Sequence, residues 1–160
     1  MIPMNDQQRS ELFEEYFKEA GFVQSYESYF LTIKTWGVTA SGAAIGVGFS
    51  KDLISQNRQL EIFVIALALA VAFWLTEVRF KLMQLAHINR QASLERALQE
   101  NTYIKSPAIL ESFGEASLVN RDQKRWRKIM LWPHVMLPHV IFVTLSLIVI
   151  VIQIVRMLHR

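Results

Sequence analysis

Three stretches of the chain are rich in apolar residues, and polar or charged segments separate them. They are residues 29–49, 60–78 and 138–157. A helix of about twenty mainly apolar residues crosses the hydrocarbon core of a bilayer, which is ~30 Å thick. The pattern therefore predicts three transmembrane helices. The N-terminus is acidic and polar, which is not the pattern of a cleavable signal peptide.

Helical spacing also occurs outside these stretches. Residues 6–20 predict an amphipathic helix that ends at Gly21, with an apolar face of Leu12, Phe13, Tyr16, Phe17 and Ala20 opposite Glu14, Glu15, Lys18 and Glu19. After residue 78 the helical pattern continues through an apolar stripe made of Val78, Leu82, Leu85, Ile88 and Ala92, then Leu94 and Leu98. Such a stripe needs a packing partner. A short helix is expected from Ser106-Pro107 to Gly114.

Together these elements predict an all-α integral membrane protein with three transmembrane helices, an N-terminal amphipathic helix and a cytoplasmic helical segment that extends the second span. The expected parts are a cytoplasmic amphipathic helix at 1–28, two transmembrane helices joined by a short external loop at 29–78, a cytoplasmic helical segment at 79–128, and a proline elbow with the third transmembrane helix at 129–160.

The distribution of charge predicts the orientation. Segment 79–128 carries ten Lys and Arg, and with Arg9, Lys18 and Lys34 this side holds thirteen of the seventeen basic residues. The positive-inside rule places this side in the cytoplasm of an inner membrane and the C-terminus outside. The N-terminal 28 residues have a net charge of −4 and segment 79–128 of +5. We therefore expect the N-terminal helix to dock onto that segment.

Small residues crowd the first predicted span, in the pairs Gly42-x-x-x-Gly46 and Ala44-x-x-x-Gly48. Such pairs let helix backbones approach closely in lipid. The candidate helix-packing or pore-lining residues are Gly37, Ser41, Gly42, Ala44, Gly46 and Gly48. The partner helix is expected within the chain or in a second copy.

Two charged residues fall at membrane depth, Lys34 in the first span and Glu77 at the end of the second. Charges at this depth are costly and are often functional. The simpler expectation is that Lys34 extends its amine to the interface, where it pairs with Glu77. Gln153, in the third span, is expected to form a hydrogen bond between helices.

The tripeptide Pro-His-Val occurs twice before the third span, at 133–135 and 138–140. Five residues along a helix separate His134 and His139 by about 140°, which does not suit a shared metal ion. Pro133 and Pro138 instead predict two successive elbows, because proline favours a first helical turn and disfavours helix in the residue before it. We expect replacement of the prolines to disturb assembly more than replacement of the histidines.

A basic segment around Trp126 precedes this repeat, and its position beside a span predicts contact with anionic lipid rather than nucleic acid. Its residues are Arg121, Lys124, Arg125, Trp126, Arg127 and Lys128. The chain has no cysteine, which excludes disulfides and thiolate chemistry. The sequence contains no nucleophile–base pair, phosphate loop or paired-carboxylate pattern, so we expect neither an enzyme nor a cofactor.

Three functions remain: a homo-oligomeric membrane protein that forms a pore or perturbs the bilayer, an accessory or scaffold subunit that binds a cytoplasmic partner through 79–128, and a small-solute or ion carrier or sensor. The layout of spans 29–49, 60–78 and 138–157 around segment 79–128 resembles the small multi-span membrane effectors of prokaryotic anti-phage systems. That resemblance implies a defence or toxicity role triggered by a partner or cue. The third span departs from their common two-span layout.

Overall fold

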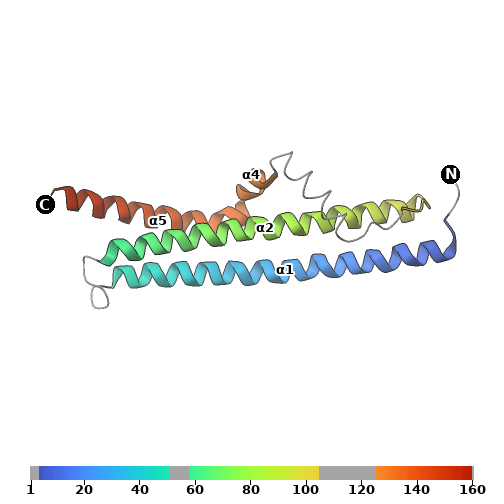
Figure 1. Ribbon diagram of the computed structural model, residues 1–160, viewed down its shortest axis with the longest axis horizontal. Coiled ribbons are helices and arrows are strands. Elements are labelled where there is room, and N and C mark those ends of the chain that lie inside the picture. The colour runs from blue at the N-terminus through green and yellow to red at the C-terminus, as the bar shows by residue number, and fades with distance from the viewer. Residues whose placement is uncertain (1–3, 51–57, 105–124, 160) are drawn as a thin grey trace. The chain divides into compact units, whose positions relative to one another are not determined.

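The computed structural model describes residues 4–50, 58–104 and 125–159. The elements in these ranges are the helices α1 (Asp6–Phe49), α2 (Gln59–Gln99), α4 (Arg125–Met130) and α5 (Pro133–Leu158), as Figure 1 shows. No strand occurs in the described ranges, so the all-α prediction is confirmed. The short helix expected from Ser106 to Gly114 lies outside them.

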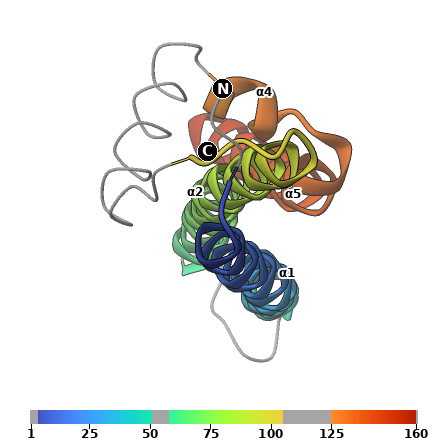
Figure 2. The same ribbon diagram turned by 90° about the vertical axis from the view of Figure 1, so that its right-hand side faces the viewer.

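The chain divides into two compact units. Unit 1 contains residues 1–30 and 79–127, and unit 2 contains residues 31–78 and 128–160. The first part of α1 and the last part of α2 therefore belong to unit 1. The rest of α1 and α2 belongs to unit 2 together with α5, and Figure 2 views the helices from a second direction.

The prediction that Gly21 ends the N-terminal helix is wrong, because α1 continues from Asp6 to Phe49. Its start has a reciprocal cap, in which Asn5 and Gln8 each donate a backbone N–H to the other's side-chain oxygen. A glycine inside a helix costs only about 1 kcal/mol relative to alanine. Contacts on both sides of Gly21, from Glu19 to His87 and from the Val23 carbonyl to Gln84, hold the helix in unit 1.

The structure does not confirm the amphipathic face predicted for residues 6–20. Leu12 is buried, but Phe13 and Phe17 are 41% and 68% exposed. The core of unit 1 contains Leu12, Leu94 and Ala97, with Met4, Tyr16, Leu98 and Ile104 packed against it. The face turned towards α2 also carries Glu15 and Glu19, which were predicted to lie on the polar face.

The continuation of the second apolar stretch as a helix is confirmed, since α2 is unbroken over 41 residues. The predicted stripe is only partly correct, because Ile88 and Ala92 are exposed whereas Gln84 and His87 are buried. Buried polar groups are tolerated where they find partners, and α1 supplies them here. The helix ends after Gln99, where Asn101 has φ 53° and the Thr102 N–H bonds the Ala97 carbonyl at 2.9 Å.

Of the two predicted proline elbows, the first is confirmed and the second is wrong. Trp132 is extended (φ −64°, ψ 132°) and Pro133 occupies the first turn of α5, while Pro138 lies inside that helix. Proline lacks an N–H, so Pro138 leaves the carbonyl of His134, four residues earlier, without its helical donor. Lys34 Nζ donates to that carbonyl at 2.5 Å. This bond supplies the His134 carbonyl with a donor in place of the backbone N–H that proline lacks.

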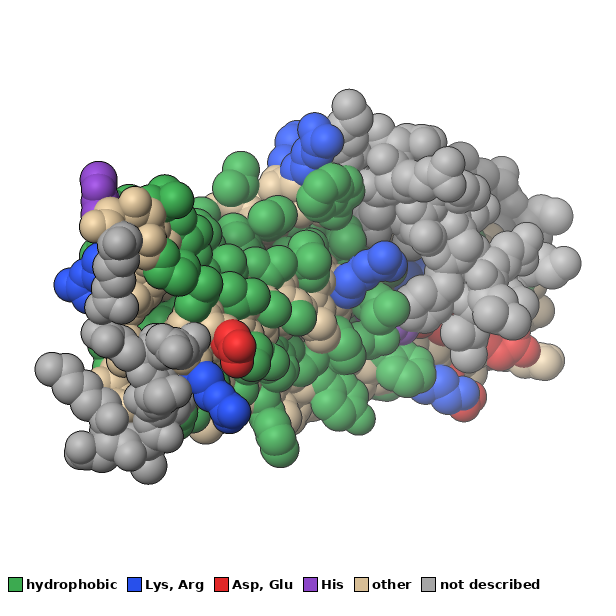
Figure 3. Space-filling view, turned by 60° about the vertical axis from the view of Figure 1, so that its left-hand side comes forward, with side chains coloured by type: hydrophobic (Ala, Val, Ile, Leu, Met, Phe, Trp, Pro, Cys, Tyr) green, Lys and Arg blue, Asp and Glu red, His purple; other side chains and the backbone are tan. Residues whose placement is uncertain are grey.

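Two helices, α2 and α5, are long and apolar enough to cross a membrane. Only 28% of the apolar segment of α2 and 17% of that of α5 are buried, whereas the core helix of a soluble protein is mostly buried. Figure 3 shows hydrophobic side chains gathered on one face of the molecule. Helix α1 does not meet the same criterion. The structure therefore supports two candidate spans, and the third remains a prediction.

One part of the core of unit 2 consists of closely packed apolar residues. Ile45, Phe63 and Ala66 form its buried cluster, with Ala44, Phe142, Val149 and Ile150 packed against it. Further along, Gln153 Nε2 donates to Gln59 Oε1 at 3.0 Å. The prediction that Gln153 forms a hydrogen bond between helices is confirmed.

Glycines allow two close approaches in unit 2. A Cβ at Gly37 would lie 2.9 Å from Phe73 Cβ, and one at Gly48 would lie 2.9 Å from the Phe63 ring. At Gly42 the contact with Phe142 is an ordinary 3.8 Å, and at Gly46 no described atom lies within 4 Å. Among the predicted packing residues, Gly37 therefore permits the closest approach to a rigid neighbour.

Gly37→Ala and Gly46→Ala form a matched pair on the same helix. Both gain up to about 1 kcal/mol in helix propensity, but only Gly37→Ala clashes, which costs about 1–3 kcal/mol. We expect Gly37→Ala to lower the thermal midpoint of unfolding in detergent and Gly46→Ala to keep or raise it. Equal midpoints for the two variants would show that α1 and α2 are not in close contact at Gly37.

A buried charged cluster as the candidate functional site

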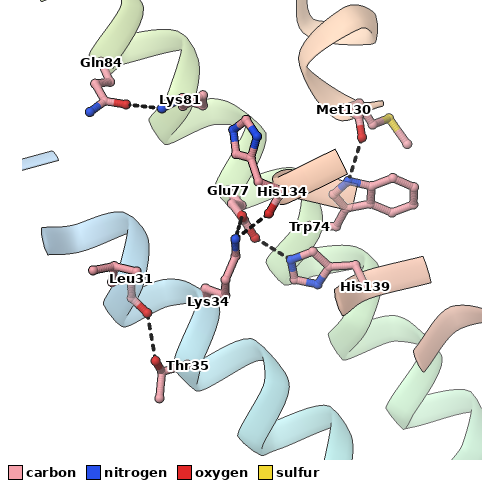
Figure 4. Close-up of polar contacts among 10 residues, drawn as sticks. All are labelled: Leu31, Lys34, Thr35, Trp74, Glu77, Lys81, Gln84, Met130, His134 and His139. Carbon is pink, nitrogen blue, oxygen red and sulfur yellow. Dashed lines mark hydrogen bonds and ion pairs between the residues drawn. The ribbon is translucent and has the colours of Figure 1, made fainter. Parts of the chain in front are cut away.

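Three helices each bring one ionisable side chain to the same place in unit 2. Lys34 comes from α1, Glu77 from α2 and His139 from α5, and Figure 4 shows them pointing toward one another. Lys34 Nζ lies 3.1 Å from Glu77 Oε1, and His139 Nε2 lies 2.5 Å from Glu77 Oε2. The side chains of Glu77 and His139 are fully buried, and that of Lys34 is 23% exposed.

The geometry defines the tautomer of His139. A carboxylate only accepts hydrogen bonds, so Nε2 of the ring carries the proton and donates it to Glu77. In the neutral ring Nδ1 is then an acceptor. It is buried and has no hydrogen-bond partner among the described residues. Figure 4 shows this second nitrogen on the side of the ring away from Glu77.

Lys34 has two partners in the cluster. Its ammonium group donates a 2.5 Å hydrogen bond to the His134 carbonyl and forms an ion pair with Glu77. The ion pair lacks hydrogen-bond alignment, so Glu77 Oε1 counts as a buried oxygen without a hydrogen bond even though a cation lies beside it. The ammonium group of Lys34 compensates the charge on Glu77 Oε1, because Coulomb attraction at 3.1 Å does not depend on that alignment.

Trp74 and Gly37 position the imidazole. The Trp74 ring is nearly parallel to that of His139, with an angle of 13° and centroids 6.3 Å apart. Its Nε1 donates to the Met130 carbonyl at 3.2 Å, at the end of α4. On the α1 side, a Cβ at Gly37 would lie 3.4 Å from His139 Cε1. The ring therefore fits between α1 and α2.

The predicted pairing of Lys34 with Glu77 is confirmed, but His139 was not predicted to join it. The geometric argument against a site shared by His134 and His139 holds, since His134 is exposed and His139 is buried. Glu77, the carboxylate that pairs with His139, lies 62 residues away in the sequence. In the described ranges no group of three or more His, Cys, Asp or Glu could hold a metal ion.

The other predicted site residues are distributed as follows. Ser41 is fully buried, Ala44 packs on the apolar cluster, and Gly42, Gly46 and Gly48 have the surroundings given above. In the basic segment, the Arg127 guanidinium lies 5.2 Å from the centre of the Trp126 ring, and Trp126, Arg127 and Lys128 are exposed. Arg125 is half-buried. Arg121 and Lys124 lie outside the described residues.

Unit 1 contains a second set of ion pairs. Glu15 Oε1 accepts from Arg90 Nη2 at 2.7 Å, and Glu19 Oε2 lies 2.6 Å from His87 Nδ1. The His87 ring lies near those of Phe22 and Tyr26, with centroids 5.0 and 5.3 Å away. The expected docking of the acidic N-terminal helix onto segment 79–128 is confirmed for the described part. The spacing of Glu15 and Glu19, which puts them on one face one turn apart, is the sequence feature that could have predicted these two pairs.

An exposed pair in the same unit provides a contrast. Lys18 lowers the pKa of Glu14, first through a side-chain hydrogen bond and then through its charge. A carboxyl group whose pKa is lower in the folded state stabilises that state at pH values above its pKa in the unfolded chain. This stabilisation is lost as the pH falls through the pKa of the folded state. Both side chains are more than 60% exposed, so solvent screens the pair.

Comparison with known protein families, curated proteins and solved structures finds no match for this chain.

The unit 1 pairs predict a difference between Arg90→Ala and Lys18→Ala. Removal of Arg90 leaves a partly buried carboxylate without its cation, which costs about 1–3 kcal/mol. We expect faster amide hydrogen exchange across residues 6–30 in Arg90→Ala and no measurable change in Lys18→Ala. Similar exchange in both variants would mean that the Glu15–Arg90 pair does not hold α1.

The cluster in unit 2 predicts strong non-additivity. Lys34→Met leaves the buried carboxylate of Glu77 without a cation and should cost about 3–5 kcal/mol. Adding Glu77→Gln removes that charge, so the double variant should be more stable than the sum of the two single effects predicts. A double-mutant cycle by denaturation in detergent measures this. Additive effects would contradict the pairing.

Proposed function

We propose that the protein is a non-enzymatic, homo-oligomeric inner-membrane protein that forms a pore or perturbs the membrane, acting as an effector in prokaryotic defence. One observation carries the proposal: Lys34, Glu77 and His139 meet inside a unit that contains both candidate spans. Ionisable groups at membrane depth are costly and usually face a bundle interior or a water-filled path. The cluster supplies polar groups that such a path requires.

In this proposal α1 provides the third span. Residues 31–49 of α1 belong to the same unit as the candidate spans of α2 and α5. Its low hydropathy has a simple explanation, since Gly37, Ser41 and Gly48 are buried, and small residues there permit close packing. The side of the membrane that holds segment 79–128 is the cytoplasm, by the positive-inside rule, and the C-terminus is external.

Association of copies is supported by the outer surface of unit 2. Apolar side chains of α5 such as Ile148 and Val151 are more than half exposed, so lipid or a second copy has to cover them. Gly46 on α1 has open space around it among the described residues, which leaves room for the backbone of another helix. Membrane lipids are the other partner, through Trp126 and the basic residues beside it.

Two other functions are compatible with the same structure. As a scaffold subunit, the protein would bind a cytoplasmic partner through 79–128. The described part of that segment already packs on α1, so a partner would use its outer face, where Ile88 is 37% exposed. As an ion carrier or sensor, it would use the cluster of Lys34, Glu77 and His139 without association.

Release of dye from liposomes tests the pore. We expect purified protein to release an entrapped dye, and Glu77→Gln to reduce release several-fold because the path loses its charge. Gly46→Leu should reduce both release and the mass of the detergent-solubilised oligomer. His134→Ala is the matched control, because its side chain is exposed on the same helix as His139. Intact vesicles at high protein density, with a monomer in detergent, would contradict the proposal.

A further inference from the structure

The side of α1 that faces away from α2 in unit 1 carries two phenylalanines. Leu12, Glu15 and Glu19 lie on the side that packs on α2. Phe17 is two residues from each of these glutamates, which is about 200° around the helix. It is 68% exposed, and Phe13, one turn earlier, is 41% exposed. The two rings therefore form one apolar patch on the outer side of α1, which we call the outer patch.

The outer patch has room for side chains of another molecule. Apolar residues scattered singly over a surface are common, whereas adjacent ones mark an interaction surface. Gly21 follows Phe17 by one turn and is exposed. A Cβ placed at Gly21 would have no neighbouring atom within 4 Å. The open surface at this glycine leaves space beside Phe17 for an aromatic ring from a partner.

Charged residues border the outer patch on two edges. On one edge, the Arg9 guanidinium lies 5.9 Å from the centre of the Phe13 ring. No ion pair joins Arg9 to a carboxylate within the described ranges. Glu14 comes five residues after Arg9, about 140° around the helix, and so lies on the other edge. It pairs with Lys18, and both side chains are more than 60% exposed.

We propose that the outer patch is the surface through which two copies of this chain associate, with α1 of one copy packed parallel to α1 of the other. Copies that enter one membrane with the same topology hold these helices parallel, and this orientation rests on the proposed function. In parallel helices packed by a common face, charged residues on opposite edges and five positions apart pair across the contact.

The charges at the edges of the outer patch favour a second copy as its occupant. In the parallel arrangement Arg9 of each copy faces Glu14 of the other, so two-fold symmetry forms the same pair twice. Lipid is a poorer occupant, because anionic headgroups attract basic helices, whereas residues 1–28 carry a net charge of −4. A second copy matches the patch without any further protein, since Arg9 and Glu14 already complement each other.

Association through the outer patch leaves the contacts of unit 1 in place. Glu15 and Glu19 bind Arg90 and His87 from the opposite side of the same helix. The α1 helix can therefore contact α2 of its own chain and α1 of a second chain at the same time. Unit 1 does not have to open, and the copies are joined outside the candidate spans.

Disulfide cross-linking tests the contact directly, because the chain has no cysteine. Ser10 is exposed and lies two turns before Phe17 on the same side of α1. Parallel packing brings the two Ser10 positions of a pair together, as a disulfide requires. We expect the full chain with Ser10→Cys, in membrane vesicles treated with a mild oxidant, to give a linked dimer as its main species.

Ala92→Cys is the matched control for this measurement. Ala92 is also exposed in unit 1, but it is two residues from the buried Leu94 and so faces away from α1. We expect this variant to stay mainly monomeric under the same oxidant. Equal yields of linked dimer at the two positions, or no dimer from Ser10→Cys, would overturn the proposal.

A second change on the Ser10→Cys background tests the apolar contact. Phe17→Gln removes the most exposed ring of the outer patch and should lower the yield of linked dimer several-fold. Ile88→Gln changes an exposed apolar residue of α2 and should leave the yield unchanged. A yield in Phe17→Gln equal to that of the parent would show that the patch is not the contact.

Exchange of charges tests the parallel arrangement, again with Ser10→Cys in every chain. Arg9→Glu alone places acids against acids across the contact, and Glu14→Arg alone places bases against bases. Each variant should therefore form several-fold less linked dimer than the parent. Mixed in the same vesicles, the two variants oppose acids to bases, so the linked heterodimer should recover. No recovery on mixing would contradict the pairing of Arg9 with Glu14 of the second copy.

The outer patch and the proposed pore fail separately. If Ser10→Cys chains form the linked dimer but vesicles retain their dye, the patch stands and the pore is wrong. If dye is released and the detergent-solubilised oligomer persists while Ser10→Cys gives no linked dimer, the pore stands and the patch is wrong. Dye release that falls several-fold in Phe17→Gln, together with the linked dimer, supports both.

Discussion

The buried carboxylate of Glu77 is the constraint on which unit 2 depends. A carboxylate removed from water is stable only with a cation and hydrogen bonds around it, and here these come from α1 and α5. The three helices must therefore meet at one level. Gly37 lets the backbones approach, and Pro138 frees a carbonyl that gives Lys34 a second partner.

Unit 1 is also held by ion pairs between α1 and α2, but the acidic and basic residues are on the opposite helices from those in unit 2. There α1 provides the acids Glu15 and Glu19 and α2 provides Arg90 and His87, whereas in unit 2 the base Lys34 is on α1 and Glu77 is on α2. Like charges at these positions would repel, so each set of pairs selects one alignment of α1 with α2. Mainly apolar helices could slide past one another at small cost, and charged pairs remove that freedom. We infer that the pairs specify register more than they add stability.

Several features followed from local sequence. The apolar stretches 60–78 and 138–157 predicted helices, and the structure has helices over both, within Gln59–Gln99 and Pro133–Leu158. Pro133 predicted a helix start, and the opposite charges of 1–28 and 79–128 predicted their contact. The errors also have local causes. Gly21 and Pro138 are helix breakers by intrinsic preference, yet tertiary contacts near each hold the helix. Phe13 and Phe17 were assigned to the packed face because apolar periodicity does not register buried ion pairs such as Glu15–Arg90.

By itself the sequence determined the helical class, the apolar segments that could span a membrane and the presence of Lys34 and Glu77 within or beside them, because these depend on spacing, composition and charge. Only the tertiary structure decided that Glu77 pairs with both Lys34 and His139, that α1 is one unbroken helix, and that Ser41 and Ser146 are buried with no hydrogen-bond partner in the described part of the chain. The physical reason is the same in each case. A side chain's partner across helices can lie sixty or a hundred residues away, and no local pattern records which faces will meet.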